Sequence, residues 1–181
     1  MSERKKQIIC LANLAFLAVL LFGCSSAKPP SAFEQDFDDD TKTWKEIGIQ
    51  LPPAPRDQDL MGFSVSGASS YYFAVDRKAL AIGSDGVFRY TLVATSPQGA
   101  RNVSYEGIRC QTQEEKTYAI GRTDGSWVKS RNTGWSKIEE VGNNRQHAAL
   151  MKEYFCPDGS AQQKLSDVLD RFKRRPPTTI L

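Results

Sequence analysis

Apolar and polar side chains alternate with a period of two over residues 60–138, and this pattern constrains the fold more than any other feature of the chain. Phe88, Tyr90 and Leu92 illustrate the repeat, and glycine-containing turns such as residues 83–86 separate the alternating runs. Successive side chains of a β-strand point to opposite faces of a sheet, so these runs are typical of antiparallel strands that bury one face. The spacing predicts a single antiparallel β-sheet of about five or six strands.

The period becomes helical toward the C-terminus. His147, Met151 and Tyr154 stand on one helical face at i, i+4 and i+7, and a second apolar stripe begins at Leu165 and reaches Phe172. We therefore expect one or two C-terminal helices packed on the sheet, in an α+β fold.

The N-terminus carries basic residues at positions 4–6, an apolar run over residues 8–22, and Gly23 directly before Cys24. The run is shorter than the roughly 20 residues that span a bilayer, and its length is typical of a signal peptide. The segment resembles the lipobox of a bacterial lipoprotein, in which the cysteine is lipidated and becomes the mature N-terminus. An uncleaved anchor and plain secretion are the alternatives.

The lipobox resemblance implies a location. Residues 1–23 would be the signal peptide, and Cys24 would carry the acyl chains, palmitate among them, that hold the protein at the membrane. Two or more chains anchor a protein stably. Ser25 follows the cysteine, and similar Gram-negative sorting signals favour the outer membrane over the inner. We expect an outer-membrane lipoprotein that faces the periplasm.

The remaining chain divides into three parts. Residues 24–43 are rich in proline, serine and aspartate, which predicts a lipidated, disordered acidic tether. Residues 44–157 form the predicted globular domain, and residues 158–181 a C-terminal helix with a basic, proline-containing tail. Without residues 1–23 the chain has 21 Lys and Arg against 20 Asp and Glu. This near-balance indicates no strongly basic face, so we expect no nucleic-acid partner.

Cys110 and Cys156 are the only cysteines in the predicted folded part. The periplasm permits disulfides, and a bridge between them would close a loop of about 46 residues, with a stabilisation on the order of 4 kcal/mol. We expect this disulfide, with two buried free thiols as the alternative.

No sequence motif indicates an enzyme. His147 is the only histidine, and its place on an apolar stripe favours a structural role. Ser126 and Lys129 fit an S-x-x-K motif, but the S-D-N and K-T-G partners of that chemistry are absent from the sequence. There is no C-x-x-C or Cys/His cluster for a metal. We expect no catalytic residues, no metal and no cofactor.

Four aromatic residues are candidates for partner binding, since aromatic side chains are enriched at interfaces: Tyr71, Tyr72, Trp127 and Trp135. A small sheet also needs such side chains to fill its core, which is the alternative interpretation.

Several segments carry a family resemblance. Residues 44–46, 51–55, 73–76, 86–93 and 105–110 read WKE, LPPAP, FAVD, GVFRYTLV and YEGIRC. They resemble the cryptic neisserial protein-like family of proteobacterial lipoproteins over about residues 40–157. That family is a domain of unknown function, so the resemblance implies no catalytic residues. A looser similarity, to the surface adhesin family called protein E, rests on a strand that ends in cysteine and a later tryptophan.

These observations together favour a non-enzymatic envelope lipoprotein. We expect a membrane-tethered binding or assembly module whose partners are envelope proteins or cell-wall components. A surface-exposed adhesin-like lipoprotein is the alternative, and an unrecognised periplasmic enzyme is a weaker one.

Overall fold

The computed structural model describes residues 44–65, 70–140, 145–160 and 163–177. The predicted signal peptide, Cys24 and the predicted tether lie outside the described residues, as do the last four residues of the predicted tail.

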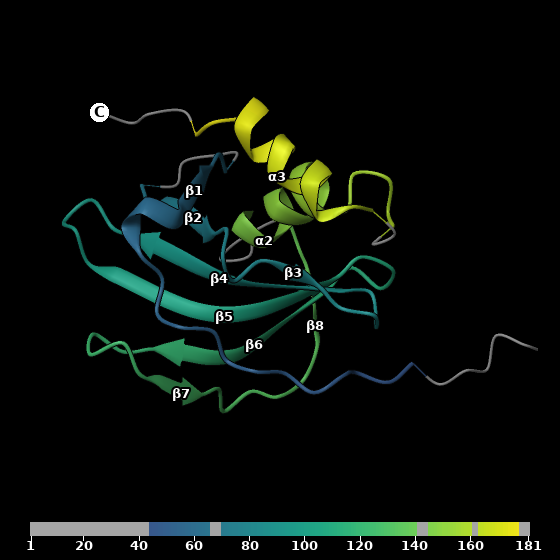
Figure 1. Ribbon diagram of the computed structural model, residues 1–181, viewed down its shortest axis with the longest axis horizontal. Helices are drawn as coiled ribbons and strands as arrows, with labels where there is room; N and C mark the ends of the chain where they lie inside the picture. The colour runs from purple at the N-terminus through teal and green to yellow at the C-terminus, as the bar shows by residue number, and fades with distance from the viewer. Residues whose placement is uncertain (1–43, 66–69, 141–144, 161–162, 178–181) are drawn as a thin grey trace, which may run out of the picture. The chain divides into compact units, whose positions relative to one another are not determined.

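An antiparallel sheet forms the centre of the described chain (Figure 1). Its eight strands are β1 (Leu60–Phe63), β2 (Tyr72–Asp76), β3 (Ala81–Ile82), β4 (Val87–Thr95), β5 (Arg101–Arg109), β6 (Glu114–Gly121), β7 (Trp127–Lys129) and β8 (Ser136–Lys137). The order is β1-β2-β4-β5-β6-β7, with β3 paired to β4 and β8 paired to β6. The antiparallel α+β prediction is confirmed, but the sheet has more strands than the five or six expected. β3 forms the expected hairpin with β4 across the turn at residues 83–86, and β8 has two residues, too few to show an alternation.

The helices follow the sheet in the chain and pack on it. Helix α2 (Arg145–Ala149) continues as the π-helical segment η5 (Leu150–Phe155), and α3 (Leu165–Arg174) contacts both η5 and β1. A short 3-10 turn, η3 (Asp57–Asp59), precedes β1. Figure 1 shows α2, η5 and α3 gathered on one side of the sheet. No helix in the described ranges is long and apolar enough to cross a membrane.

The main core lies between the sheet and these helices. It is built from apolar side chains of both layers: Phe63, Phe73, Val75, Phe88, Tyr90, Leu92 and Ile108 from strands, and Leu150, Met151, Tyr154, Phe155, Val168 and Phe172 from helices. The rings of Phe88 and Phe155 stack at 4.9 Å between centroids. Aromatic burial of this kind dominates the stability of a small core, so the C-terminal helix belongs to the same folded body as the sheet.

A disulfide joins Cys110 and Cys156, as predicted. Cys110 directly follows β5 and Cys156 directly follows η5. The bond therefore links the end of a central strand to the end of the first helical segment.

A bulge changes the register between β5 and β6. The pairing shifts between Tyr105 and Glu106, and the ring of Tyr118 then lies over Gly107. A Cβ atom on Gly107 would stand 2.7 Å from the Tyr118 hydroxyl. A larger residue here would therefore have to displace the Tyr118 ring, which lies on the face of the sheet opposite the helices.

Candidate functional site

Residues 44–55 form a strap that crosses the face of the sheet opposite the helices (Figure 1). We call this side the strap face. Two indole groups hold the strap: Trp44 Nε1 donates to the Asp85 carbonyl at 2.9 Å, and Trp127 Nε1 donates to the Pro52 carbonyl at 2.7 Å. The prolines at 52, 53 and 55 keep the chain extended and out of a central strand.

Asp85 is the buried attachment point for the first part of the strap. Its carboxylate accepts two hydrogen bonds from the buried Arg89 guanidinium, at 2.9 and 2.6 Å, and one from the Ile47 backbone amide at 3.0 Å. Burial raises the pKa of Asp85, but the hydrogen bonds and charge of Arg89 more than offset this, so the pKa lies below its ordinary value. The carboxylate is therefore ionised and pairs with Arg89.

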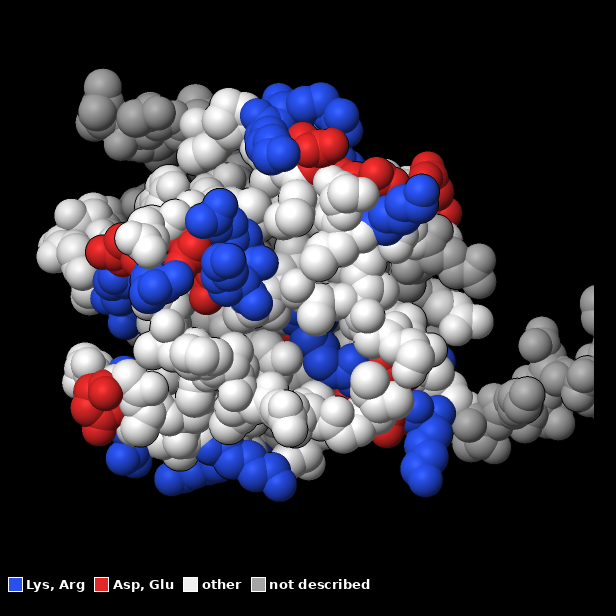
Figure 2. Space-filling view, in the orientation of Figure 1, with Lys and Arg blue, Asp and Glu red and all other residues white. Residues whose placement is uncertain are grey.

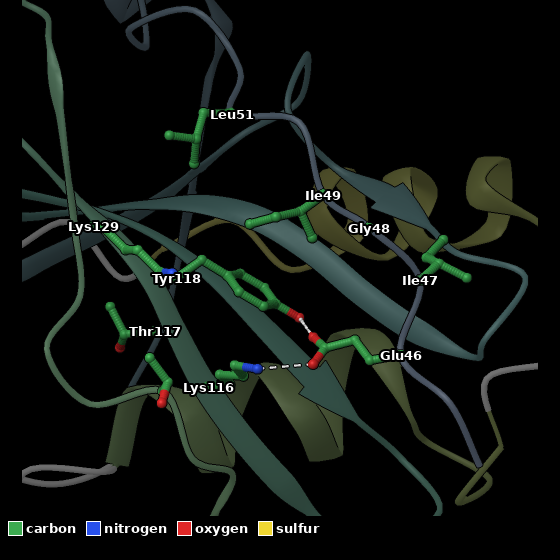
Figure 3. A pocket seen from close by; sticks show the side chains of 10 residues that line it. Glu46, Ile47, Gly48, Ile49, Leu51, Lys116, Thr117, Tyr118 and Lys129 are labelled. Carbon is green, nitrogen blue, oxygen red and sulfur yellow. Dashed lines mark hydrogen bonds and ion pairs between the residues drawn. The ribbon is translucent and has the colours of Figure 1, made fainter. Parts of the chain in front are cut away.

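Glu46 joins the strap to β6. Its carboxylate accepts hydrogen bonds from Lys116 Nζ at 2.7 Å and from the Tyr118 hydroxyl at 2.6 Å (Figure 3). Burial raises the pKa of Glu46, whereas these two hydrogen bonds and the charges of Lys116 and Arg89 lower it below its ordinary value. The glutamate, the lysine and the tyrosine form one connected polar group.

Aromatic rings pack around these polar contacts. Trp44 meets Trp135 edge-to-face at 5.8 Å, and the Arg109 guanidinium lies 3.9 Å from the centre of the Trp44 ring. Trp127 packs on Tyr105 at 6.2 Å. These rings hold the strap by contact with the sheet, in addition to its few hydrogen bonds.

The four aromatic residues singled out from the sequence fall into two groups. Trp127 and Trp135 lie on the strap face, half-buried by their contacts with the strap. Tyr71 and Tyr72 are exposed at the start of β2. Three strands separate β2 from β7, so the two groups do not form a single surface.

A groove lies between the strap and strand β6, with a volume of about 490 Å³ (Figure 3). Its lining consists of strap residues, β6 residues and two residues at and after β7: Glu46, Ile47, Gly48, Ile49, Leu51, Lys116, Thr117, Tyr118, Lys129 and Thr133. The volume is within the range of small-ligand sites. Its shape depends on the strap, which forms one complete wall.

The strap wall is apolar and open to solvent. Ile47, Ile49 and Leu51 are 41%, 36% and 44% exposed. Sequence reasoning missed this wall, although the alternation of three large apolar residues before a proline run was visible. It also missed Glu46, Lys116 and Asp85, because no local pattern links positions so far apart in the chain.

The titratable groups of the groove are Glu46, Lys116, Tyr118 and Lys129. Burial and the Glu46 hydrogen bond raise the pKa of Tyr118 well above its ordinary value, so at neutral pH the phenol stays protonated and donates a hydrogen bond to the Glu46 carboxylate. Among the described residues, no group of three or more His, Cys, Asp or Glu side chains is arranged to hold a metal ion. The arrangement is suited to holding a ligand against an apolar wall and a lysine-bearing floor.

A sequence model of the CNP1-like family matches residues 39–173. The chain belongs to this family. The CNP1-like match includes the whole strap and all eight strands, so both walls of the groove lie within the family domain. The function of CNP1-like proteins is unknown. No curated protein and no solved structure gives a significant match to this chain.

Proposed function

We propose that this CNP1-like protein is an outer-membrane lipoprotein, tethered through Cys24 and facing the periplasm, that acts as a non-enzymatic binding or assembly module. Its partner would be another envelope protein or a cell-wall component. The observation that carries the proposal is the groove, which three exposed apolar side chains of the strap line together with Tyr118 and two lysines.

The exposed apolar wall favours a binding role. Covering a partly exposed isoleucine or leucine contributes on the order of 1 kcal/mol. Ile47, Ile49 and Leu51 stand side by side on one segment next to a hollow. Contiguous apolar surface beside a groove is typical of an interaction site rather than of an inert surface.

Membrane anchoring would compensate for a weak affinity of the groove for its partner. A lipid at Cys24 and a 20-residue tether over residues 24–43 would confine the domain near the membrane. Confinement raises the effective concentration of a binding module for neighbours on the same surface, without any new contact. A modest intrinsic affinity would then suffice for assembly in the envelope.

Photo-crosslinking in intact cells tests the proposal. A photo-reactive residue at position 49 stands on the groove wall, and one at the exposed Ser166 of α3 is the matched control. We expect discrete crosslinked adducts from position 49 and few or none from position 166. Equal adducts from both positions, or none from position 49, would contradict a binding role for the groove.

Exposure at the cell surface is tested separately. If the protein faces the periplasm, protease added to intact cells leaves it whole, and cleavage begins only after the outer membrane is opened. Cleavage in intact cells would instead support the adhesin-like alternative.

A further inference from the structure

We infer that the groove takes an extended acidic segment of a partner polypeptide, bound alongside the strap. This inference rests on the proposed function and names the chemistry of the ligand. It is drawn from three properties of the groove: free backbone groups, alternating side chains and the sign of its charge.

The backbone of the strap is free where it forms the wall. Between Ile47, whose amide is held by Asp85, and Pro52, whose carbonyl is held by Trp127, residues 48–51 make no backbone hydrogen bond to any described residue. Unpaired amides and carbonyls along an extended segment are the groups that a peptide uses when it adds as a neighbouring strand. A folded surface or a small molecule would leave most of them unused.

The side chains of the wall alternate in the way that an extended ligand requires. The large apolar side chains that line the groove stand at every second position, 47, 49 and 51, and Glu46 and Gly48 of the strap line it as well. Successive residues of an extended chain advance about 3.3 Å, so positions 47 to 51 cover about 13 Å, or about four residues of a bound strand. Every second side chain of such a ligand would contact the apolar wall, and the others would point away.

The charge of the groove favours carboxylates. Two lysines and one glutamate line it, and Glu46 is already neutralised by its ion pair with Lys116. Lys129 has no ion pair within the described part of the chain. Figure 2 shows basic side chains along the lower margin of this view, where Figure 1 places β7. The cationic side of the groove therefore lacks a counter-charge that an acidic ligand would supply.

Lys129 is the residue expected to select for charge. It ends β7 and lines the groove, with its side chain exposed. Lys116, by contrast, holds the strap through Glu46, so its replacement would disturb the wall itself. Lys129 makes no side-chain hydrogen bond or ion pair with another described residue, so its replacement leaves the strap in place and makes it the sharper probe.

A peptide array tests the inference. The probe is a set of immobilised octapeptides of random sequence, each acidic member paired with a copy in which Glu and Asp are replaced by Gln and Asn. The protein is the full lipidated chain in detergent micelles. We expect the acidic members to bind about tenfold better than their amide copies at low salt, with the difference reduced at high salt.

Two variants make the array decisive. Lys129→Glu should lose about tenfold in binding to the acidic peptides, whereas Lys164→Glu, an exposed lysine that directly precedes α3, should change binding little. Equal binding to the acidic peptides and their amide copies would overturn the inference. So would binding of the acidic peptides by Lys129→Glu as strong as by wild type. Crosslinks from position 49 to a glycan or a lipid would also overturn it while leaving the proposed binding function intact. Absence of crosslinks from position 49 would contradict both the acidic-segment inference and the proposed binding function.

Discussion

Nε2 of His147 lies 2.8 Å from Oε2 of Glu106, and both side chains are buried between α2 and the sheet. The glutamate also accepts hydrogen bonds from the Tyr90 hydroxyl at 2.9 Å and from the Ser104 hydroxyl at 2.6 Å. The single histidine of the chain is thus a polar attachment of helix to sheet, beside a core built mainly of apolar side chains. A buried pair of this kind is costly to break because each partner leaves the other uncompensated.

This pair should make stability depend on pH. Burial lowers the pKa of His147, but Glu106 raises it above the ordinary 6.5; burial raises the pKa of Glu106, but His147, Ser104 and Tyr90 lower it below the ordinary 4.5. The histidine contribution is complete below pH 6.5 and is lost as pH rises through the raised pKa. The glutamate contribution is complete above pH 4.5 and is lost as pH falls through the lowered pKa. Stabilisation by the pair should therefore be greatest between pH 4.5 and 6.5.

The measurement is urea unfolding of wild type and His147→Gln across pH. We expect the substitution to reduce the free energy of unfolding by about 1–3 kcal/mol at pH 6 and by less at pH 9. Arg145→Gln, an exposed position on the same helix, is the control and should show no such trend. If the loss of unfolding free energy in His147→Gln were the same from pH 6 to pH 9, the pair would not titrate as described.

Removal of the disulfide should destabilise the domain without changing its fold. The bond closes a 46-residue separation between Cys110 and Cys156, so the double replacement by alanine should cost about 4 kcal/mol in the free energy of unfolding. Wild type treated with a reductant should move toward the variant in the same urea titration. Superimposable unfolding curves with and without the bond would refute this prediction.

Asp85→Asn should loosen the strap. The substitution keeps the size of the side chain but leaves the buried Arg89 without its main counter-charge, so we expect a loss of about 3 kcal/mol. The strap should also become more accessible to trypsin, observed as faster cleavage after the exposed Lys45. Asp124→Asn is the control, because that aspartate caps an exposed turn through Ser126. Similar cleavage rates in the two variants would argue against Asp85 as the attachment point.

Gly107→Ala should disturb the floor of the groove. The added Cβ would stand 2.7 Å from the Tyr118 hydroxyl, which is itself held by Glu46. We expect a loss of about 1–3 kcal/mol, measured by thermal unfolding, as the ring is displaced. At Gly134 the nearest atom to a new Cβ is 3.6 Å away, so Gly134→Ala should stay within about 0.5 kcal/mol of wild type. If both variants unfold at the same temperature, the close approach of Tyr118 to Gly107 does not limit the size of the residue at this position.

Cys24→Ser should release the protein from the membrane, because the substituted hydroxyl cannot take the thioether-linked lipid. Fractionation of cells, with immunodetection of membrane and soluble pools, measures the change. Cys10→Ser, within the predicted signal peptide, is the matched control and should leave the protein with the membrane. Retention of Cys24→Ser in the membrane fraction would refute lipid anchoring at this residue.

Much of the fold was predictable because its signals are local or nearly so. The alternation through Phe88, Tyr90 and Leu92 indicated strands with one buried face, and the helical stripe through Met151 and Tyr154 indicated the layer that covers them. The disulfide followed from the count of cysteines in the folded part. The hairpin that joins β3 to β4 was indicated by the turn at residues 83–86, whereas β8 escaped prediction because two residues carry no period.

The candidate site was not predictable in the same way. Trp127 and Trp135 were named from the sequence as candidates for partner binding, but their contacts with the strap were not predicted. Glu46 meets Lys116 and Tyr118 across 70 and 72 positions of chain. Pairing at that separation leaves no periodic trace in the sequence, since it depends on how the strap crosses the sheet.

By itself the sequence determined the α+β class, the antiparallel sheet, the C-terminal helices and the Cys110–Cys156 bond. These features depend on side-chain periodicity and on composition, both of which can be read one segment at a time. Only the tertiary structure decided where residues 44–55 lie, and with that the groove, its apolar wall and the place of Lys129 in its lining. The physical reason is that the strap has no helix or strand of its own, so its position depends on long-range contacts with the sheet through Asp85, Tyr118 and Trp127.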